Sequence, residues 1–242
     1  MKGNFIKLGT ALIVACLSLP AKASDDASNS VEASANVGFV SEYLFRGVSQ
    51  TDDTPAVQGG LDLSLNLGAE TAIYVGAWGS NVKFTDASAE IDYYAGIAGP
   101  IGNFGTSFDI GGIYYTYPGS ANSLNYDFIE AQVGLSQDLG FASIGVSLNY
   151  SPENFGDSGE AYYPKLSLDI PVGDYFSIGG YLARQYVEDN TAFALPDYNE
   201  WNASVSGSVY GFDLALAYSD TDVGGDPDGS GPAVIVSIAR SF

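Results

Sequence analysis

Apolar and polar side chains alternate along most of the chain after residue 30, in segments of about ten residues. From Val57 to Leu67 the odd positions are apolar or glycine, and the even positions are polar or glycine. The same alternation recurs over residues 142–149 and 202–209. This period of two predicts β-strands with one apolar and one polar face. Small residues and Asn, Ser and Asp on the polar face suit the lumen of a barrel better than the packed core of a sandwich.

Turn-forming residues divide these segments into a regular series of short and long connections. Short connections are expected near residues 68–70, 99–105, 137–140, 171–174 and 211, and long ones near residues 47–54, 81–90, 118–125, 151–160, 188–197 and 220–231. Because the two kinds alternate, both termini should lie at the end with the short turns. The pattern predicts an all-β fold, a transmembrane antiparallel up-and-down β-barrel of about 12 strands with short periplasmic turns and longer extracellular loops.

Aromatic residues gather near both ends of the expected strands, as the two membrane interfaces require. Near the long loops stand Tyr43, Phe45, Tyr93, Tyr150, Tyr162 and Trp201, and near the short turns Phe104, Phe141, Tyr175, Tyr210 and Phe212. The chain ends on Phe242 after the alternating Val234, Val236 and Ile238, although Arg240 interrupts the pattern. Such an ending suits recognition by the barrel-assembly machinery, which we expect as a partner during biogenesis.

The first residues have the pattern of a secretory signal. Lys2 and Lys7 precede an apolar run over residues 8–19, and a small-x-small site predicts cleavage after Ala23. Lipoprotein processing at Cys16 is the alternative. We therefore expect a signal peptide over residues 1–23, a short polar lead-in over residues 24–30, and an outer-membrane barrel over residues 31–242.

The composition excludes several classes of function. The net charge is −21, and removal of the signal would leave five basic against 29 acidic residues, a net charge of −24, so a nucleic-acid partner is not expected. The chain has no histidine, which barrel hydrolases generally use as a general base, so we expect no enzyme and no catalytic residues. No apolar stretch is long enough for a helical membrane span.

If the odd residues of segment 57–67 face lipid, the alternation directs a set of polar side chains into the lumen. The pore-lining candidates are Glu42, Arg46, Gln58, Asp62, Asp92, Asp109, Glu130, Lys165, Asp169 and Asp213. Since most of them are acidic, we expect a cation-favouring channel, with Arg46 and Lys165 forming a transverse field at a constriction. The alternative is that these bases pair with the acids in interior salt bridges and plug a narrow barrel.

Three further features leave alternatives open. Residues 47–58 form either a loop over the pore mouth or a rigid hairpin whose side chains bond each other, with Arg46 approaching Gln58. Interior tyrosines such as Tyr94 and Tyr115 could fill the lumen. Arg184 shares the parity of apolar residues, which an end position or a bulge would explain.

The last long loop carries four aspartates around a glycine turn, an arrangement that could gather a calcium ion. The candidate ligands are Asp220, Asp222, Asp226 and Asp228. The loop lacks the closing glutamate of a complete calcium loop, so a solvated acidic loop is the stronger interpretation, and no other cofactor is expected.

Three segments carry a specific family resemblance. Residues 41–51 (SEYLFRGVSQT), 55–62 (PAVQGGLD) and 74–82 (YVGAWGSNV) resemble the TorF-type proteobacterial porins, a family formerly of unknown function. Glu42 stands where aspartate is more usual. The resemblance implies a channel in the bacterial outer membrane but no established substrate.

Two functions remain. The favoured one is an outer-membrane porin-like channel for passive diffusion of small hydrophilic solutes, with outer-membrane lipid around it. The other is a closed barrel with a structural, adhesive or receptor role carried by its external loops. A soluble ligand-binding barrel would expose the outward leucines and aromatics to water.

Overall fold

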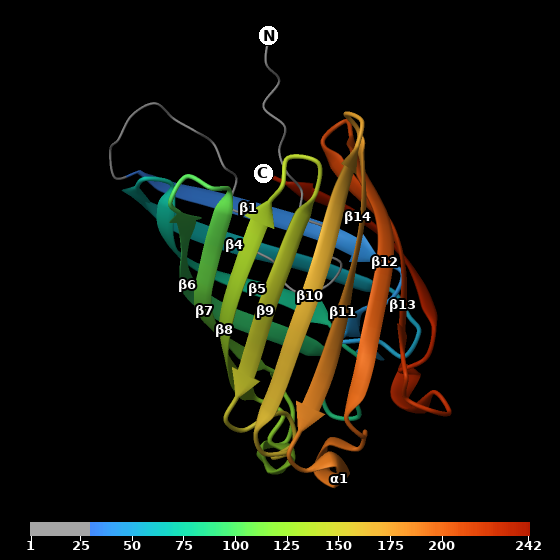
Figure 1. Ribbon diagram of the computed structural model, residues 1–242. Helices are drawn as coiled ribbons and strands as arrows, with labels where there is room; N and C mark the ends of the chain where they lie inside the picture. The colour runs from blue at the N-terminus through green and yellow to red at the C-terminus, as the bar shows by residue number, and fades with distance from the viewer. Residues whose placement is uncertain (1–29) are drawn as a thin grey trace.

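The computed structural model describes residues 30–242, so the expected signal peptide, its alternative processing site at Cys16 and all but the end of the lead-in lie outside the described residues. Twelve antiparallel strands close into one barrel in the order β1-β14-β13-β12-β11-β10-β9-β8-β7-β6-β5-β4 (Figure 1). The predicted fold class is therefore confirmed. No helix within the described residues is long and apolar enough to cross a membrane.

The barrel strands are joined by hairpin connections, and two further strands form a small separate sheet that is not part of the barrel wall. The barrel strands are β1 (Val31–Val40), β4 (Ala56–Gly68), β5 (Thr71–Asn81), β6 (Ala89–Ile101), β7 (Thr106–Thr116), β8 (Phe128–Asp138), β9 (Ser143–Ser151), β10 (Ala161–Val172), β11 (Phe176–Val187), β12 (Tyr198–Val209), β13 (Phe212–Thr221) and β14 (Ala233–Ser241). The small sheet pairs β2 (Leu44–Phe45) with β3 (Val48–Ser49). The loops add the short helices η1 (Asn122–Leu124), α1 (Asn190–Phe193) and η2 (Pro227–Gly229).

The short turns gather at one end of the barrel with the carboxyl terminus, and the long connections gather at the other (Figure 1). We call these the short-turn end and the long-loop end. The predicted long connections agree with the structure except the first, which begins directly after Val40 and extends to Pro55.

Strands β1 and β14 close the barrel, with Asn36 opposite Ser241 and Val40 opposite Ser237. The terminal residue extends this pairing, because the Phe242 amide donates to the Ala35 carbonyl at 2.8 Å and the Ala35 amide donates back at 3.2 Å. The carboxyl terminus thus belongs to the seam of the barrel.

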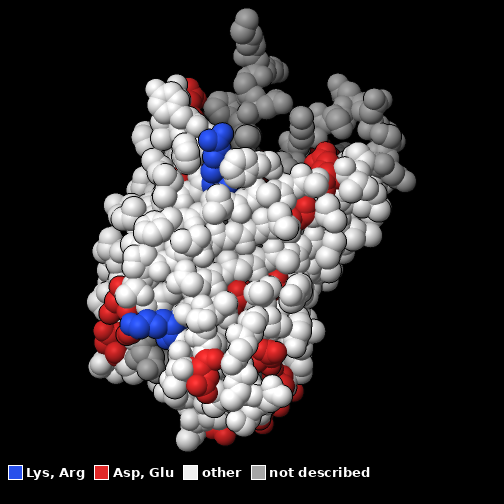
Figure 2. Space-filling view, turned by 180° about the vertical axis from the view of Figure 1, so that it is seen from behind, with Lys and Arg blue, Asp and Glu red and all other residues white. Residues whose placement is uncertain are grey.

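The outer wall of the barrel is apolar. Strand residues such as Leu61, Val146 and Leu216 are exposed there, while their chain neighbours face the interior. Figure 2 shows a broad, mostly uncharged face, with acidic residues gathered mainly toward the long-loop end. A continuous apolar surface of this extent is suited to contact with lipid.

The expected girdles are largely present, with two corrections. Tyr93 and Tyr162 are exposed on the outer wall, as are Phe104, Phe141 and Tyr210 near the short turns. Tyr43 and Phe45 lie instead inside the barrel, because β1 ends before them and the chain turns inward.

The two outward arginines lie near the ends of their strands. The Arg184 guanidinium lies 4.7 Å from the Tyr186 ring centroid and donates to Asn199 Oδ1 at 3.1 Å near the long-loop end. Arg240 lies over the rings of Phe212 and Phe242 near the short-turn end. An end position, not a bulge, therefore explains Arg184, and both cations can reach polar surroundings while their stems cover apolar rings.

Two adjacent positions on β12 test which face meets lipid. Val205→Arg should destabilise the barrel in lipid vesicles by about 2–4 kcal/mol, because it places a charge on the outer wall midway along the strand. Ser206→Arg is the matched control, since Ser206 faces the lumen between Ser177 and Ala215. Urea unfolding followed by gel mobility would measure both. Equal losses of stability in the two variants would contradict this assignment of the faces.

Candidate functional site

The first long connection folds into the barrel and forms a hairpin there, which we call the inward hairpin (residues 41–55). Its strands β2 and β3 pair Leu44 with Ser49 and Phe45 with Val48. The Gln50 amide donates to the Tyr43 carbonyl at 2.7 Å and the Tyr43 amide to Thr51 Oγ1 at 3.1 Å. The hairpin is thus fixed by hydrogen bonds between its own residues.

The tip of the inward hairpin consists of Arg46 and Gly47, with φ angles of 52° and 78°. Two successive positive φ angles are typical of the tight turn that joins hairpin strands, for which Asn-Gly is the favoured sequence. Glycine adopts this conformation freely, but an arginine there is strained. The contacts of the Arg46 side chain offset that strain.

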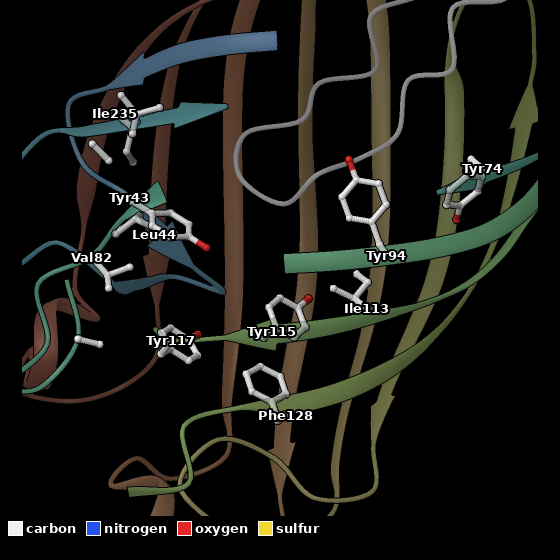
Figure 3. Close-up of a cluster of buried hydrophobic side chains, with 13 residues drawn as sticks. Tyr43, Leu44, Tyr74, Val82, Tyr94, Ile113, Tyr115, Tyr117, Phe128 and Ile235 are labelled. Carbon is white, nitrogen blue, oxygen red and sulfur yellow. The ribbon is translucent and has the colours of Figure 1, made fainter. Parts of the chain in front are cut away.

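Aromatic and aliphatic side chains anchor the hairpin to the wall at the long-loop end. The Tyr43 ring meets Trp78 edge-on at 5.5 Å, and the Phe45 ring meets Tyr115 at 5.6 Å. Figure 3 shows Tyr43 and Leu44 inside the barrel within a cluster that also includes Tyr115 and Phe128. This cluster removes water from the long-loop half of the lumen.

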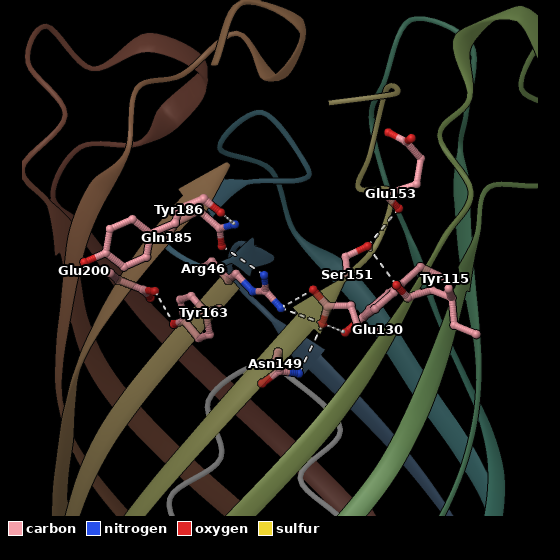
Figure 4. Close-up of polar contacts among 11 residues, drawn as sticks. Arg46, Tyr115, Glu130, Asn149, Ser151, Glu153, Tyr163, Gln185, Tyr186 and Glu200 are labelled. Atoms are coloured by element: carbon pink, nitrogen blue, oxygen red, sulfur yellow. Dashed lines mark hydrogen bonds and ion pairs between the residues drawn. The ribbon is translucent and has the colours of Figure 1, made fainter. Parts of the chain in front are cut away.

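The Arg46 guanidinium reaches across the lumen to the opposite wall (Figure 4). Its Nη2 donates to both oxygens of Glu130 on β8 at 2.6 Å, and its Nη1 donates to Gln185 Oε1 on β11 at 2.9 Å. The group lies 4.3 Å from the Tyr163 ring centroid and 4.7 Å from that of Phe45. Burial acts to lower the pKa of Arg46, but the Glu130 carboxylate and the nearby tyrosines raise it overall, so the guanidinium stays charged.

The partners of Arg46 are themselves held in place. Glu130 also accepts bonds from Asn149 Nδ2 at 3.2 Å and from the Tyr115 hydroxyl at 3.3 Å. The Tyr198 hydroxyl donates to the Arg46 carbonyl at 2.9 Å. Arg46 is 6% exposed, and Glu130 and Gln185 are each 1% exposed. At this level the lumen is filled by protein side chains.

Beyond the inward hairpin, toward the long-loop end, aromatic residues from three neighbouring connections pack together. The Tyr126 and Phe155 rings stack at 4.5 Å, and Phe84 meets Tyr117 at 5.4 Å. These residues extend the packed region toward the external loops.

The other half of the lumen, toward the short-turn end, has a different lining. Asp62, Asp109, Asp169 and Asp213 point inward there and are only partly buried, as is Lys165. Most of their inward neighbours are small, including Ser147, Ser167, Ser177, Gly179, Ser206 and Ser237. Carboxylates on the walls of a confined polar space create a negative field.

The structure therefore separates the ten pore-lining candidates into three groups. Asp62, Asp109, Lys165, Asp169 and Asp213 line the short-turn half; Gln58, Asp92 and Glu130 face the packed half; Glu42 and Arg46 lie on the inward hairpin. The strand positions expected for Glu42 and Arg46 are wrong, because β1 ends at Val40.

The expected approach of Arg46 to Gln58 is also wrong. Arg46 reaches Glu130 on the far wall, and Gln58 Nε2 donates to Ser80 Oγ at 3.4 Å. Glu42 lies at the base of the hairpin, where burial is the main cause that raises its pKa and the nearby Asp53 carboxylate adds to the effect. The inward hairpin thus combines the two expected possibilities, since it is internally bonded and it occupies the lumen.

Sequence reasoning missed four members of this site: Glu90, Tyr163, Gln185 and Glu200. Glu200 and Tyr163 share the inward parity of their strands, so continued alternation would have found them. Glu200 accepts bonds from the hydroxyls of Tyr163 and Tyr181, both at 2.5 Å.

The aspartates expected to gather calcium have separate hydrogen-bond donors. Asp222 accepts from the Asn199 amide at 2.7 Å, Asp220 from the Tyr218 hydroxyl at 2.8 Å, and Asp226 from the Gly231 amide at 2.6 Å. Within the part of the chain that the structure describes, no group of three or more acidic or cysteine side chains could hold a metal. Calcium binding by these residues and Asp228 stays a prediction.

Comparison with known proteins gives a family match and a shared barrel fold. A family model described as "Bacterial protein of unknown function (Gcw_chp)" matches residues 24–234. No curated protein matches the sequence. The TorF assignment itself stays a prediction, although structural neighbours support a porin-like fold.

Three solved structures share the fold at low sequence identity. The COG4313 outer membrane channel from Pseudomonas putida F1 has a TM-score of 0.58 at 13% identity, covering 90% of this chain and 98% of the other. The KdgM porin has a TM-score of 0.57 at 9% identity, with coverages of 86% and 99%. The NanC porin has a TM-score of 0.53 at 12% identity, with coverages of 87% and 98%.

Proposed function

The chain belongs to the Gcw_chp family of bacterial proteins of unknown function, and we propose that it is an outer-membrane, porin-like channel. It lets small hydrophilic solutes diffuse passively and favours cations. The observation that carries this proposal is the short-turn half of the lumen, which is polar, partly water-accessible and lined by Asp62, Asp109, Asp169 and Asp213. An apolar outer wall surrounds this lumen, as in a barrel that spans lipid.

The proposed orientation follows from the two ends of the barrel. The long loops lie outside the cell and the short turns in the periplasm, as in bacterial barrels generally. The secretory pattern of the first residues supports export. The position of Phe242 in the seam supports recognition of the terminal strand by the barrel-assembly machinery. The outer-membrane porin fold of the structural neighbours agrees with this location.

The inward hairpin divides the channel into a closed and an open part. At the level of Arg46 the side chains interlock, so passage of a solute requires the hairpin to shift or its side chains to rearrange. The constriction has one charged pair, Arg46 with Glu130, and not a set of unpaired bases.

The same burial favours a second function, a closed barrel with a structural, adhesive or receptor role. A buried ion pair whose side chains are 5% and 1% exposed is what a plugged lumen requires. In that case the external loops carry the function, and the short-turn half of the lumen is a cavity that the inward hairpin closes on one side.

Conductance separates these two functions. The refolded mature chain, in a planar bilayer under a potassium chloride gradient, should give steady current steps and a cation-favouring reversal potential. Replacing Asp62, Asp109, Asp169 and Asp213 by asparagine should bring the cation-to-anion permeability ratio toward about 1, because the negative field is removed. Asp174→Asn, in an exposed turn, is the control and should leave the ratio unchanged.

Each outcome of this experiment selects a function. Anion preference in the unaltered chain would keep the channel and overturn the charge argument. If the protein is shown to be folded and inserted but gives no current, both unaltered and with the inward hairpin removed, the closed barrel is favoured.

A further inference from the structure

Carboxylates inside the barrel repeatedly accept hydrogen bonds from tyrosines. The Tyr94 hydroxyl donates to Asp62 at 2.5 Å, Tyr74 to Asp109 at 2.9 Å and Tyr43 to Glu90 at 3.2 Å. Glu130 and Glu200 have the same kind of partner, from Tyr115, Tyr163 and Tyr181. Each pair places a carboxyl group against the hydroxyl of a tyrosine.

Two of the chain's own cations lie on such groups. The Arg46 guanidinium donates hydrogen bonds to both carboxylate oxygens of Glu130 and lies against the Tyr163 ring. The Tyr163 hydroxyl in turn donates to Glu200. The Lys165 ammonium lies 5.6 Å from the Tyr181 ring centroid and acts electrostatically on Glu200. The lumen therefore contains a built geometry for guanidinium and for primary ammonium groups.

This geometry suits organic cations more than inorganic ones. A guanidinium ion is planar, weakly hydrated, and able to bind a carboxylate with two parallel bonds while an aromatic ring covers its face. A potassium ion has no N–H groups, so it cannot donate the directional hydrogen bonds that the Glu130 and Gln185 oxygens accept from Arg46. The tyrosine hydroxyls hold the carboxylates, and the Tyr163 ring faces the Arg46 guanidinium.

The wall carries most of this guanidinium site without help from the inward hairpin. Glu130, Gln185 and Tyr163 come from β8, β11 and β10, and Asn149 and Tyr115 position Glu130 from β9 and β7. We call Glu130, Gln185 and Tyr163 the wall site. The inward hairpin adds the guanidinium itself and the Phe45 ring.

The backbone at the tip of the inward hairpin is strained at Arg46. Arg46 is held at a φ of 52°, where asparagine or glycine is favoured, and its Nε has no hydrogen-bond partner among the described residues. The backbone is thus strained to deliver this side chain to the wall. A free cation with the same chemistry needs no such strain.

We propose that the wall site binds small organic cations bearing a guanidinium or primary ammonium group, and that Arg46 is its built-in occupant. The inference that such cations are solutes of the channel rests on the proposed function. The inference that the wall site binds them does not. A solute that takes the wall site displaces Arg46 and frees the inward hairpin.

Agmatine, which carries both groups, is the probe, and calorimetry on the refolded full barrel in detergent is the measurement. Arg46→Ala should bind agmatine at least about tenfold more tightly than the unaltered chain, because the internal competitor is gone. Arg46→Ala with Glu130→Gln should lose at least about tenfold of that affinity, since the carboxylate charge is removed.

Arg46→Ala with Asp213→Asn is the matched control. Asp213 is another inward carboxylate, but it accepts a hydrogen bond from Ser208 Oγ at 2.5 Å and not from a tyrosine. This double variant should bind agmatine as tightly as Arg46→Ala alone. Equal weakening by Glu130→Gln and Asp213→Asn would overturn the wall site in favour of a diffuse field.

Three further results test the proposal. If Arg46→Ala refolds poorly, agmatine during refolding should restore the yield, and no restoration would overturn the site. If the variant conducts potassium but does not bind agmatine, the inference is wrong and the channel stands. If agmatine binds while no variant conducts, the site is correct and the proposed channel is wrong.

Discussion

Removal of the Arg46 side chain should raise the single-channel conductance several-fold. In Arg46→Ala the guanidinium no longer bridges the lumen to Glu130 and Gln185, and its volume becomes available to water and ions. The exposed Glu130 carboxylate should at the same time increase cation preference. Planar-bilayer recordings in symmetric potassium chloride measure the first effect, and the reversal potential in a salt gradient measures the second.

A graded pair of variants tests whether the inward hairpin is the constriction. Replacing residues 44–49 by two glycines should raise the conductance further than Arg46→Ala, because Leu44 and Phe45 also leave the lumen. Lys83→Ala is the control: it breaks the exposed ion pair with Asp52 on the same hairpin and leaves Arg46 in place. Unchanged conductance after loss of the hairpin tip would show that the constriction lies elsewhere.

The barrel wall could be predicted from the sequence because each strand is subject to the same local requirement. Lipid on one side and water or packed side chains on the other impose a period of two, which is visible in residues 57–67 without knowledge of the neighbouring strands. The short turns add local signals, such as Tyr210-Gly211, where both φ angles are positive. The strand number and the polarity of the lumen half near the short turns follow from these local rules.

The inward hairpin could not be predicted because its position depends on contacts that are distant in sequence. Alternation continues past Val40 through Glu42 and Arg46, so these residues resemble the end of a strand. Their actual place is decided by partners such as Glu130 and Gln185, which lie 84 and 139 residues away. The arginine at the hairpin tip gives no turn signal, because asparagine is the usual residue there.

The largest loss of stability should follow from breaking the Arg46 and Glu130 pair from one side. Glu130→Ala leaves a charged guanidinium buried without its carboxylate, and we expect the free energy of unfolding to fall by about 3–5 kcal/mol. Glu130→Gln should cost less, since the amide oxygen still accepts one hydrogen bond. Urea unfolding in lipid vesicles, followed by the shift in gel mobility between folded and unfolded barrel, provides the measurement.

A double-mutant cycle separates the pair from the packing around it. Arg46→Met with Glu130→Leu removes both charges but keeps apolar volume, so it should recover most of the stability that Glu130→Leu alone loses. Gln185→Leu is the control partner, because Gln185 accepts one bond from Arg46 but carries no charge. Its coupling with Arg46→Met should be the smaller of the two. Additive losses for Arg46 and Glu130 would mean that the inward hairpin is held by its apolar anchors at Tyr43 and Leu44, and that the charged pair is free to exchange its cation.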